Sequence, residues 1–304
     1  MMRSSMAVVF LLFGGVGAGS AQDTLRVMSW NLESGGSAVT TIAAQIQAFD
    51  GIDIWGFSEV PSNAKTQYQR GAGLGEGAFF DGVMSQSGGG DRLLIVFDTG
   101  RFDLLGSAEL DEINSPELHH RSPLVAHFRE KATGLEFKFM VNHLARGDNS
   151  RRHIQATQLN DWAETQTLPV VAVGDYNFDW DLPNGTSHDQ GFDNLLADDV
   201  FVWVKPDPVK RTQCSEEDGG CRFNSVLDFV FVAGPAKSWT AESDVVVRAG
   251  DFPDNDLTSD HRPVEAMFVT DTAEATTRAQ ILARIVALEA ELAALRALVM
   301  RLPP

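Results

Sequence analysis

The chain has 304 residues, of which 43% are hydrophobic and 9% aromatic, enough to bury a large globular core. Its formal net charge at pH 7 is −18, which argues against binding of nucleic acid or anionic membranes through a general positive surface. Beyond the N-terminal residues, no stretch is long and apolar enough to predict a transmembrane span.

The N-terminus predicts export. Arg3 precedes an apolar run from Ala7 to Phe13, and small residues follow up to Ala21. A basic start, a short hydrophobic core and a small-residue end are typical of a secretory signal. The alternative, a buried N-terminal helix, is disfavoured by the glycines within residues 14–19, because glycine weakens helices. We predict a signal peptide over residues 1–21 and a secreted or periplasmic protein.

The next elements predict a layered α/β domain. Residues 25–30 alternate with the period of a strand that ends at Asn31, and residues 53–58 form a second strand that ends at Glu59. Between them, Ser37 is the expected N-cap of a helix with an apolar stripe over residues 39–49. The β-helix-β order favours an α/β fold. The segment Gly71 to Gly90 is rich in glycine and predicts a loop.

Successive strands then predict a mixed sheet. Residues 93–97, 102–110, 123–129 and 136–141 have strand composition with no helix between them, which favours antiparallel pairing. A helix is expected over residues 151–164, and further strands over 168–173, 226–232 and 265–269.

Two cysteines, Cys214 and Cys221, bracket a short polar segment. In an exported protein such a pair most simply forms a disulfide. The alternative is a two-cysteine metal site, which has no histidine partners nearby in the sequence.

Polar side chains mark the ends of the apolar runs. Asp260 and His261 stand together at the entry to the last strand, and Asp228 lies within an apolar strand. A carboxylate inside a strand is costly unless it is paired, so the sequence favours a dyad of Asp228 with His261. Taken singly, each polar residue has a plainer interpretation: Asn31 and Asn177 as turn residues, Glu59 as a solvated rim residue.

The full set resembles the endonuclease/exonuclease/phosphatase superfamily over roughly residues 25–270. The resemblance rests on seven pieces in order: Trp30-Asn31-x-Glu33, Glu59, Arg121-x-Pro123, Asn142-His143-Leu144, Gly174-Asp175-x-Asn177, Asp228 and Ser259-Asp260-His261. It implies a four-layered α/β sandwich with two packed mixed sheets, formed by a catalytic domain over residues 22–271. It also implies a metal-dependent phosphoesterase.

The resemblance further implies a role for each residue. Glu59 would be the main metal ligand, with Asn31, Glu33 and Asp260, while Asp175 and Asn177 would bind phosphoryl oxygens, water or a second metal. His261 would act as general base or orient the attacking water, supported by Asp228. His143 and Arg121 would contact the scissile phosphate. Oxygen ligands without cysteine favour Mg²⁺ or Mn²⁺, with Ca²⁺ as a further candidate.

The C-terminal residues predict a helix with heptad periodicity. Apolar residues recur in steps of four and three from Ile281 to Leu302, with opposite charges flanking the seam. We predict a coiled coil over residues 272–304 and a homodimer through residues 278–302. A helix docked on its own domain is the alternative.

The substrate is the least defined part of the prediction. Within the phosphoesterases we expect a nuclease acting on a phosphodiester, with nucleic acid as its partner. A sphingomyelinase-like or other small-substrate phosphodiesterase or phosphatase is the first alternative, and a catalytically silent scaffold of the same fold is the second. Arg146, Arg151 and Arg152 could form a small positive funnel beside His143, or could simply solvate a helix start.

Overall fold

The computed structural model describes residues 24–114, 121–214, 221, 224–252, 257–270 and 285. The predicted signal peptide lies outside these residues, as does the predicted coiled coil except for Ile285, so both stay predictions. Within the described ranges, no helix has the length and apolar character needed to cross a bilayer.

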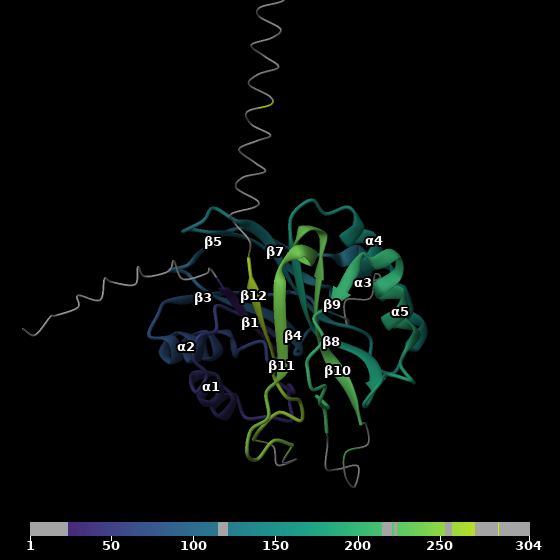
Figure 1. Ribbon diagram of the computed structural model, residues 1–304. Coiled ribbons are helices and arrows are strands. Elements are labelled where there is room, and N and C mark those ends of the chain that lie inside the picture. The colour runs from purple at the N-terminus through teal and green to yellow at the C-terminus, as the bar shows by residue number, and fades with distance from the viewer. Residues whose placement is uncertain are drawn as a thin grey trace, which may run out of the picture.

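The described chain forms a sandwich of four layers (Figure 1), as the family resemblance implied. The first sheet has the order β11 (Thr240–Val245), β12 (Val264–Val269), β1 (Thr24–Asn31), β2 (Ile54–Val60), β4 (Arg92–Asp98), β3 (Phe80–Met84). The second has the order β5 (Phe102–Glu109), β6 (Leu124–Glu130), β7 (Glu136–His143), β8 (Val170–Asp181), β10 (Ser225–Ala233), β9 (Phe201–Trp203).

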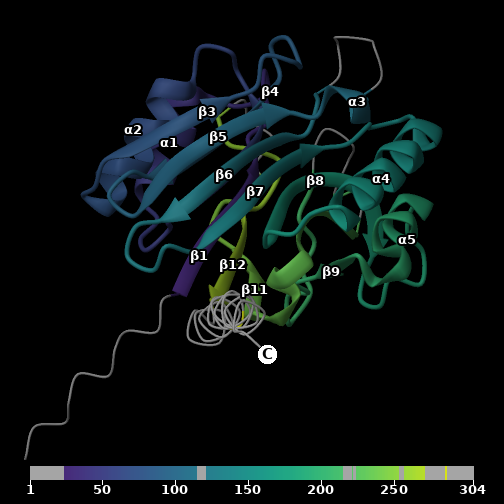
Figure 2. The ribbon, with the colours of Figure 1, turned by 90° about the horizontal axis from the view of Figure 1, so that it is seen from above.

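Helices cover the outer faces of the two sheets. Seen from above (Figure 2), α1 (Val39–Gln47) and α2 (Lys65–Glu76) flank the first sheet, and α4 (Asn149–Glu164) and α5 (Gln190–Leu196) flank the second. Shorter helical turns are α3 (Asp111–Asn114) and the 3₁₀ turns η1 (Ala197–Asp199) and η2 (Gly234–Ser238).

Both sheets are mixed. The pairs β1–β2 and β7–β8 are parallel, whereas neighbours such as β1–β12, β2–β4, β6–β7 and β8–β10 are antiparallel. The predicted meander needs one correction: its first strand, β4, lies in the first sheet, and the next, β5, begins the second sheet. The chain crosses between the sheets there because Phe102 and Phe97 both pack into the core that the sheets share.

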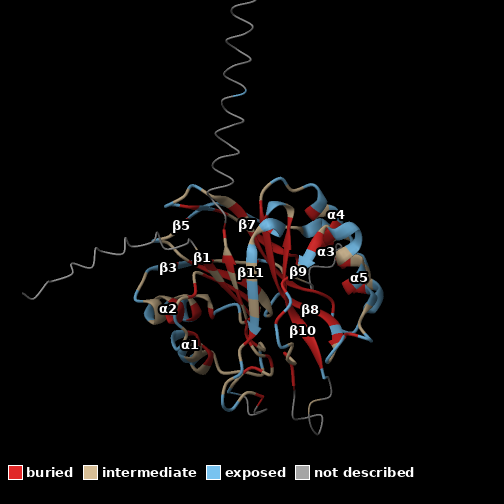
Figure 3. Cartoon of the chain, in the orientation of Figure 1, coloured by how far each residue is buried: buried red, intermediate tan, exposed pale blue. Residues whose placement is uncertain are grey.

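Strand alternation builds three hydrophobic cores. On β8, Val171 and Val173 pack between the sheets, whereas Val170 and Ala172 pack beneath α4 and α5. A third core, which includes Trp55, lies between the first sheet and its helices. The buried colouring in Figure 3 follows the strands of both sheets, and the exposed colouring follows outer segments such as β11. Period-two alternation therefore decides which residues face the partner sheet.

The glycine-rich segment is not the loop that was predicted. It contains the second half of α2 and all of β3. A Cβ added at Gly71 would lie 2.6 Å from the carbonyl oxygen of Ala43, so this glycine allows α2 to pack closely on α1. Close packing of the two helices thus outweighs the low helix propensity of glycine.

Two local predictions have different outcomes. Ser37 is not the N-cap of α1: Ala38 holds that position, and the Ser37 hydroxyl donates to the carbonyl oxygen of Leu32 instead. The disulfide prediction is confirmed, since Cys214 and Cys221 are bonded with their Cα atoms 4.5 Å apart.

Candidate active site

The candidate site lies where the core between the two sheets ends. On β8, Asp175 and Asn177 continue the face that carries Val171 and Val173. On β10, Asp228 shares its face with Val230 and Val232, and on β7 His143 continues the face of Val141. In place of further core side chains, the second sheet therefore contributes four polar residues to the site: His143, Asp175, Asn177 and Asp228.

A register shift turns Glu59 toward the same place. The pairing of β2 with β4 is irregular between Phe57 and Val60, and Glu59 has a left-handed backbone with φ of 52°. Phe57 and Val60 both pack into the outer core, so the bulge frees Glu59 to face the second sheet. A second register shift, between Val226 and Asp228, lies beside the other buried carboxylate.

Left-handed backbone recurs at predicted site residues. Glu33 has φ of 52° and Asn177 has φ of 54°. Each such residue costs about 1 to 2 kcal/mol of backbone strain, which the surrounding fold must offset. Strain of this kind concentrates where side chains are aimed at a ligand.

Two glycines bring the catalytic strands together. A Cβ at Gly174 would lie 2.0 Å from the carbonyl oxygen of Asn142, and one at Gly56 would lie 2.4 Å from Val173 of the opposite sheet. Because neither position has room for a side chain, β8 can pair closely with β7, and β2 can approach β8. Asp175 then pairs in register with His143.

His261 and Asp228 form a dyad that joins the two sheets. His261 Nδ1 lies 2.8 Å from Asp228 Oδ2, and both residues are buried. The backbone of His261 is fixed at the end of β1, because its N–H donates to Ser259 Oγ at 3.0 Å and its carbonyl oxygen accepts from Trp30 Nε1 at 2.9 Å. The predicted pairing of Asp228 with His261 is thus present in the structure.

The surroundings of His261 favour its charged form. Burial by itself lowers the pKa of the imidazole. The charge of Asp228, the hydrogen bond that Asp228 accepts from His261, and the charges of Asp260 and Asp175 together raise that pKa well above its usual value. His261 Nε2 points toward the site, 3.9 Å from Asp175 Oδ2 and 3.8 Å from Asp260 Oδ1.

A second group forms around His143. Its Nε2 lies 3.7 Å from Glu59 Oε1 and 3.6 Å from Asp175 Oδ2, and neither ring nitrogen has a hydrogen-bond partner among the described residues. Burial lowers the pKa of His143 well below its usual value, assisted by the charges of Arg121, His261 and Arg146. Burial therefore disfavours protonation of this ring.

The amide of Asn31 connects the two carboxylates. Its Nδ2 donates to Glu59 Oε1 and to Asp175 Oδ2, both at 3.0 Å, while its Oδ1 accepts from the N–H of Glu33 at 3.0 Å. The backbone N–H of Asn177 donates to Asp175 Oδ1 at 2.9 Å. Burial, followed by the charge of Asp228, raises the pKa of Asp175 to about 7.

Glu33 and Asp260 lie together beside His261. Glu33 Oε2 accepts from the N–H of Asp260 at 2.8 Å. Burial and then the charge of Asp260 raise the pKa of Glu33 to about 7. A carboxylate that is hard to ionise in this position would gain from a nearby cation.

Arg121 is bound by an acidic partner. Its Nη1 forms an ion pair with Asp91, and the charge of Arg121 acts on His143, which places the guanidinium next to the site. Burial raises the pKa of Asp91 to about 6, although Arg121 opposes this shift. Sequence reasoning did not foresee this pair.

The donor set fits a divalent cation. Ligand atoms of Glu59, His143 and Asp175 lie within 4.8 Å of one another, as do those of Asp175, Asp228 and His261. The unpartnered His143 Nε2 beside two carboxylates is the feature that a bound cation would explain. Of the six predicted ligands, the structure brings Asn31, Glu59 and Asp175 into direct contact, joins Asn177 to Asp175, and places Glu33 with Asp260 next to them.

A polar cavity of about 490 Å³ opens beside this cluster. Its lining also includes His153, His188 and Asp189, to which the sequence analysis assigns no role. Asp189 accepts from Arg152 Nη2 at 2.6 Å and His153 Nε2 at 3.1 Å, and it caps α5. The N-cap pattern of an aspartate before a helix was the available signal for Asp189.

The comparisons with known proteins agree with this geometry. Residues 28–261 match the model of the Endonuclease/Exonuclease/phosphatase family. No curated protein matches the sequence.

Solved structures share the fold at low sequence identity. A Bacteroides thetaiotaomicron mannosyl-6-phosphatase aligns with a TM-score of 0.60 and 22% identity over 81% of this chain and 100% of that one. A D. rerio TDP2 humanised by 14 mutations aligns with a TM-score of 0.63 and 16% identity over 81% and 99%. The human Nocturnin catalytic domain aligns with a TM-score of 0.56 and 19% identity over 81% and 94%. Enzymes of the matched family are divalent-metal-dependent phosphoesterases, and the chain belongs to this endonuclease/exonuclease/phosphatase family.

Proposed function

We propose that the buried cluster at the sheet ends is the active site of a divalent-metal-dependent phosphoester hydrolase. The observation that carries the proposal is the meeting of two groups at Asp175: the His261–Asp228 dyad and the Glu59–His143–Asp175 cluster. A hydrolase needs a group that manages the proton of water next to groups that neutralise phosphoryl charge. Here those two groups share one carboxylate.

Glu59 and Asp175 would hold the cation, with Asn31, Glu33, Asp260 and Asn177 around them. When bound, a divalent cation supplies charge neutralisation to the phosphoryl oxygens. Mg²⁺ and Mn²⁺ suit the oxygen ligands best, and the nitrogen of His143 favours Mn²⁺ of the two.

The His261–Asp228 dyad would handle the proton of the attacking water. Asp228 accepts the hydrogen bond at Nδ1, which leaves Nε2 directed into the site. When the ring is neutral with its proton on Nδ1, Nε2 takes a proton from water, and the same Asp228 charge that raises the pKa of His261 stabilises the resulting imidazolium. Arg121, held in place by Asp91, would bind the phosphoryl oxygens from the side of the second sheet.

For the substrate, we propose a small, hydroxyl-bearing phosphoester. Among the described residues that line the cavity, none is Phe, Tyr or Trp, and hydrogen-bonding side chains such as Asn149, Asp179, Ser187 and Gln190 prevail. Such walls bind hydroxyl groups, and the described lining offers no Phe, Tyr or Trp ring on which a nucleobase could stack. Arg152 does not serve as a funnel cation, because Asp189 and the carbonyl oxygen of Ala145 already bind its guanidinium.

A nuclease, which the sequence favoured, is the second candidate. The observation in its favour is Arg146, an exposed cation on the cavity wall that could bind a second phosphate. We also propose that the enzyme is exported, since a structural disulfide such as Cys214–Cys221 persists in oxidising compartments.

A substrate panel tests these proposals. The protein without residues 1–21 is incubated with a sugar phosphate, a chromogenic phosphodiester, sphingomyelin, single-stranded RNA and supercoiled plasmid, each with Mg²⁺, Mn²⁺ or EDTA. We expect metal-dependent hydrolysis of the small esters and weak nicking of plasmid. Plasmid cleavage as fast as small-ester cleavage would favour the nuclease, and no metal-dependent turnover on any substrate would contradict the proposed function.

A further inference from the structure

A three-residue segment touches both halves of the site. Thr212, Gln213 and Cys214, which we name the clamp segment, are buried between β10 and residues 260–262. The Cys214–Cys221 disulfide joins its end to the chain that leads into β10. Sequence reasoning assigned the disulfide and gave no role to Thr212 or Gln213.

On one side the clamp segment holds the backbone of Asp228. Thr212 Oγ1 accepts from the N–H groups of Leu227 at 2.9 Å and Asp228 at 3.2 Å. These N–H groups lie at the register shift of β10, where the regular ladder is interrupted and buried donors need other partners. The Thr212 hydroxyl therefore fixes the bulge that presents Asp228.

On the other side it holds the two neighbours of His261. The N–H of Arg262 donates to the carbonyl oxygen of Thr212 at 2.7 Å, and the N–H of Cys214 donates to that of Asp260 at 2.9 Å. Together these bonds form an isolated antiparallel bridge between Gln213 and His261. The clamp segment thus bonds to β10, which carries Asp228, and to the backbone on both sides of His261.

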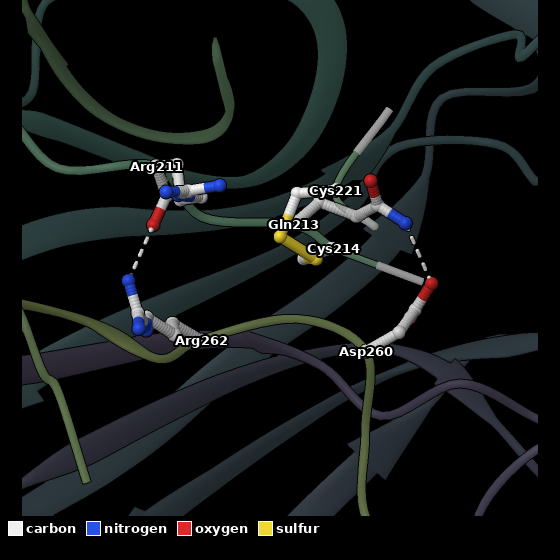
Figure 4. Close-up of a disulfide and its surroundings, with 6 residues drawn as sticks. All are labelled: Arg211, Gln213, Cys214, Cys221, Asp260 and Arg262. Atoms are coloured by element: carbon white, nitrogen blue, oxygen red, sulfur yellow. Dashed lines mark hydrogen bonds between the residues drawn. A yellow bond between two sulfur atoms is a disulfide. The ribbon is translucent and has the colours of Figure 1, made fainter. Parts of the chain in front are cut away.

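The side chain of Gln213 sets the rotation of the Asp260 carboxylate. Gln213 Nε2 donates to Asp260 Oδ2 at 2.7 Å, which Figure 4 shows next to the disulfide. Asp260 Oδ1 is then left on the site side, 3.8 Å from His261 Nε2. On the opposite side of the disulfide, Arg262 Nη1 donates to the carbonyl oxygen of Arg211 at 3.3 Å (Figure 4).

We propose that Thr212 and Gln213 are positioning residues of the active site, held in place by the Cys214–Cys221 disulfide. Thr212 keeps Asp228 and His261 within hydrogen-bond distance across the two sheets, and Gln213 directs one oxygen of Asp260 into the site. The inference rests on the proposed function for its catalytic consequence. Its structural part can be tested without any substrate.

The first test compares Thr212→Val with Thr212→Ser. Valine has the shape of threonine but no acceptor for the two N–H groups, whereas serine retains the hydroxyl. We expect Thr212→Val to lower kcat about 10- to 100-fold with little change in KM, and Thr212→Ser to restore most of it. Equal activity of the two variants, or a loss confined to KM, would overturn the role of Thr212.

The second test measures Mn²⁺ binding by calorimetry in the absence of substrate. Gln213→Met removes the bond to Asp260, and we expect about 10- to 100-fold weaker Mn²⁺ binding. The matched control is Gln190→Met, since Gln190 lines the same cavity but bonds to Asp193 and Asn194. Equal Mn²⁺ affinity of Gln213→Met and the parent would overturn the role of Gln213.

The third test follows amide hydrogen exchange in the parent and in the Cys214→Ser, Cys221→Ser double variant. We expect faster exchange at Cys214 or its replacement, Asp228 and Arg262, with the amides of β7 unchanged. Unchanged exchange at those three amides would overturn the role of the disulfide. If the double variant does not fold, the same amides are followed in Thr212→Val, where faster exchange at Asp228 supports the clamp and unchanged exchange refutes it.

These tests separate the inference from the proposed function. A parent that is silent on every substrate contradicts the function, while the Mn²⁺ and exchange experiments still decide the inference. Normal exchange and Mn²⁺ binding in active variants contradict the inference alone.

Discussion

The two ends of the sandwich both bury charges, but they treat them differently. At the end where β1 and β2 begin, Arg101 contacts Asp53 at 2.6 Å, Glu130 at 2.7 Å and the carbonyl oxygen of Thr24 at 2.8 Å. Thr133 donates to the other oxygen of Glu130 at 2.6 Å. The guanidinium and its carboxylates satisfy one another, so this end needs nothing from outside the chain.

At the opposite end, buried polar atoms remain without partners in the described part of the chain. They include both ring nitrogens of His143, Oδ1 of Asp228, Oδ1 of Asp91 and Nε of Arg121. Each such atom costs about 1 to 3 kcal/mol of desolvation that no bond within the chain returns. The comparison teaches that a satisfied cluster stabilises the fold, whereas an unsatisfied one is retained for what binds there.

The largest expected effect is on turnover at the unsatisfied end. His261→Ala removes the group that takes the proton, so kcat should fall about 10²- to 10⁴-fold while the variant still folds and unfolds cooperatively. The matched control is His127→Ala, because His127 pairs with Glu136 at 3.0 Å outside the site. Kinetics and thermal unfolding of the three proteins provide the check, and a few per cent residual activity in His261→Ala would refute its role.

The satisfied end should show the reverse pattern. Arg101→Met leaves Asp53 and Glu130 without their cation and should lower the free energy of unfolding by about 3 kcal/mol with kcat unchanged. Arg129→Met is the control, since its ion pair with Glu136 at 2.7 Å is exposed and should contribute less than about 1 kcal/mol. If urea unfolding showed equal losses of unfolding free energy in Arg101→Met and Arg129→Met, the proposed difference between the two ends would be wrong.

Divalent metal should stabilise the folded chain by binding at the unsatisfied end. At 100 times the dissociation constant, Mn²⁺ should raise the free energy of unfolding by about 2.7 kcal/mol, and EDTA should abolish both this gain and turnover. The gain should vanish in a variant with Glu59→Gln and Asp175→Asn and persist in Arg101→Met. Differential scanning calorimetry with and without Mn²⁺ makes the measurement; a gain retained by the double variant would place the metal elsewhere.

The smallest expected effect is on the pH dependence of stability. Burial raises the pKa of Asp91 from 3.8 to about 6, so the folded chain holds this proton more tightly than the unfolded chain. That contribution is fully present below about pH 4 and is lost as the pH rises toward 6. Relative to Asp91→Asn, the parent should therefore lose stability between these values and change little above them. The effect is modest because the Asp91 side chain is 33% exposed. If the stability of the parent relative to Asp91→Asn instead increased with pH, this prediction would be wrong.

Much of the site could be predicted because its residues follow apolar runs. Alternation along β8 and β10 dictates that Asp175 and Asp228 face the other sheet, and a buried carboxylate there required a partner. The bulge at Glu59 could not be predicted, since a one-residue register shift depends on how two strands pair and leaves no local mark.

Other features depended on contacts between distant segments. Gly71 reads as a loop residue until α1 lies against it. Thr212 and Asp189 are ordinary polar residues until β10 and α4 supply the N–H groups and the guanidinium that they bind. Local sequence patterns therefore identified which strands carry chemistry, while the supporting contacts emerged only from the tertiary fold.

The division of the dyad between two sheets has a further consequence. The strands of the second sheet all lie within residues 102–233. The chain then returns to the first sheet, where His261 precedes β12. A slip of about 1 Å between the sheets would break the 2.8 Å bond from His261 to Asp228 and leave every strand ladder intact. Turnover therefore depends on the relative position of the two sheets. During mild denaturation, activity should decrease before circular dichroism records any loss of secondary structure.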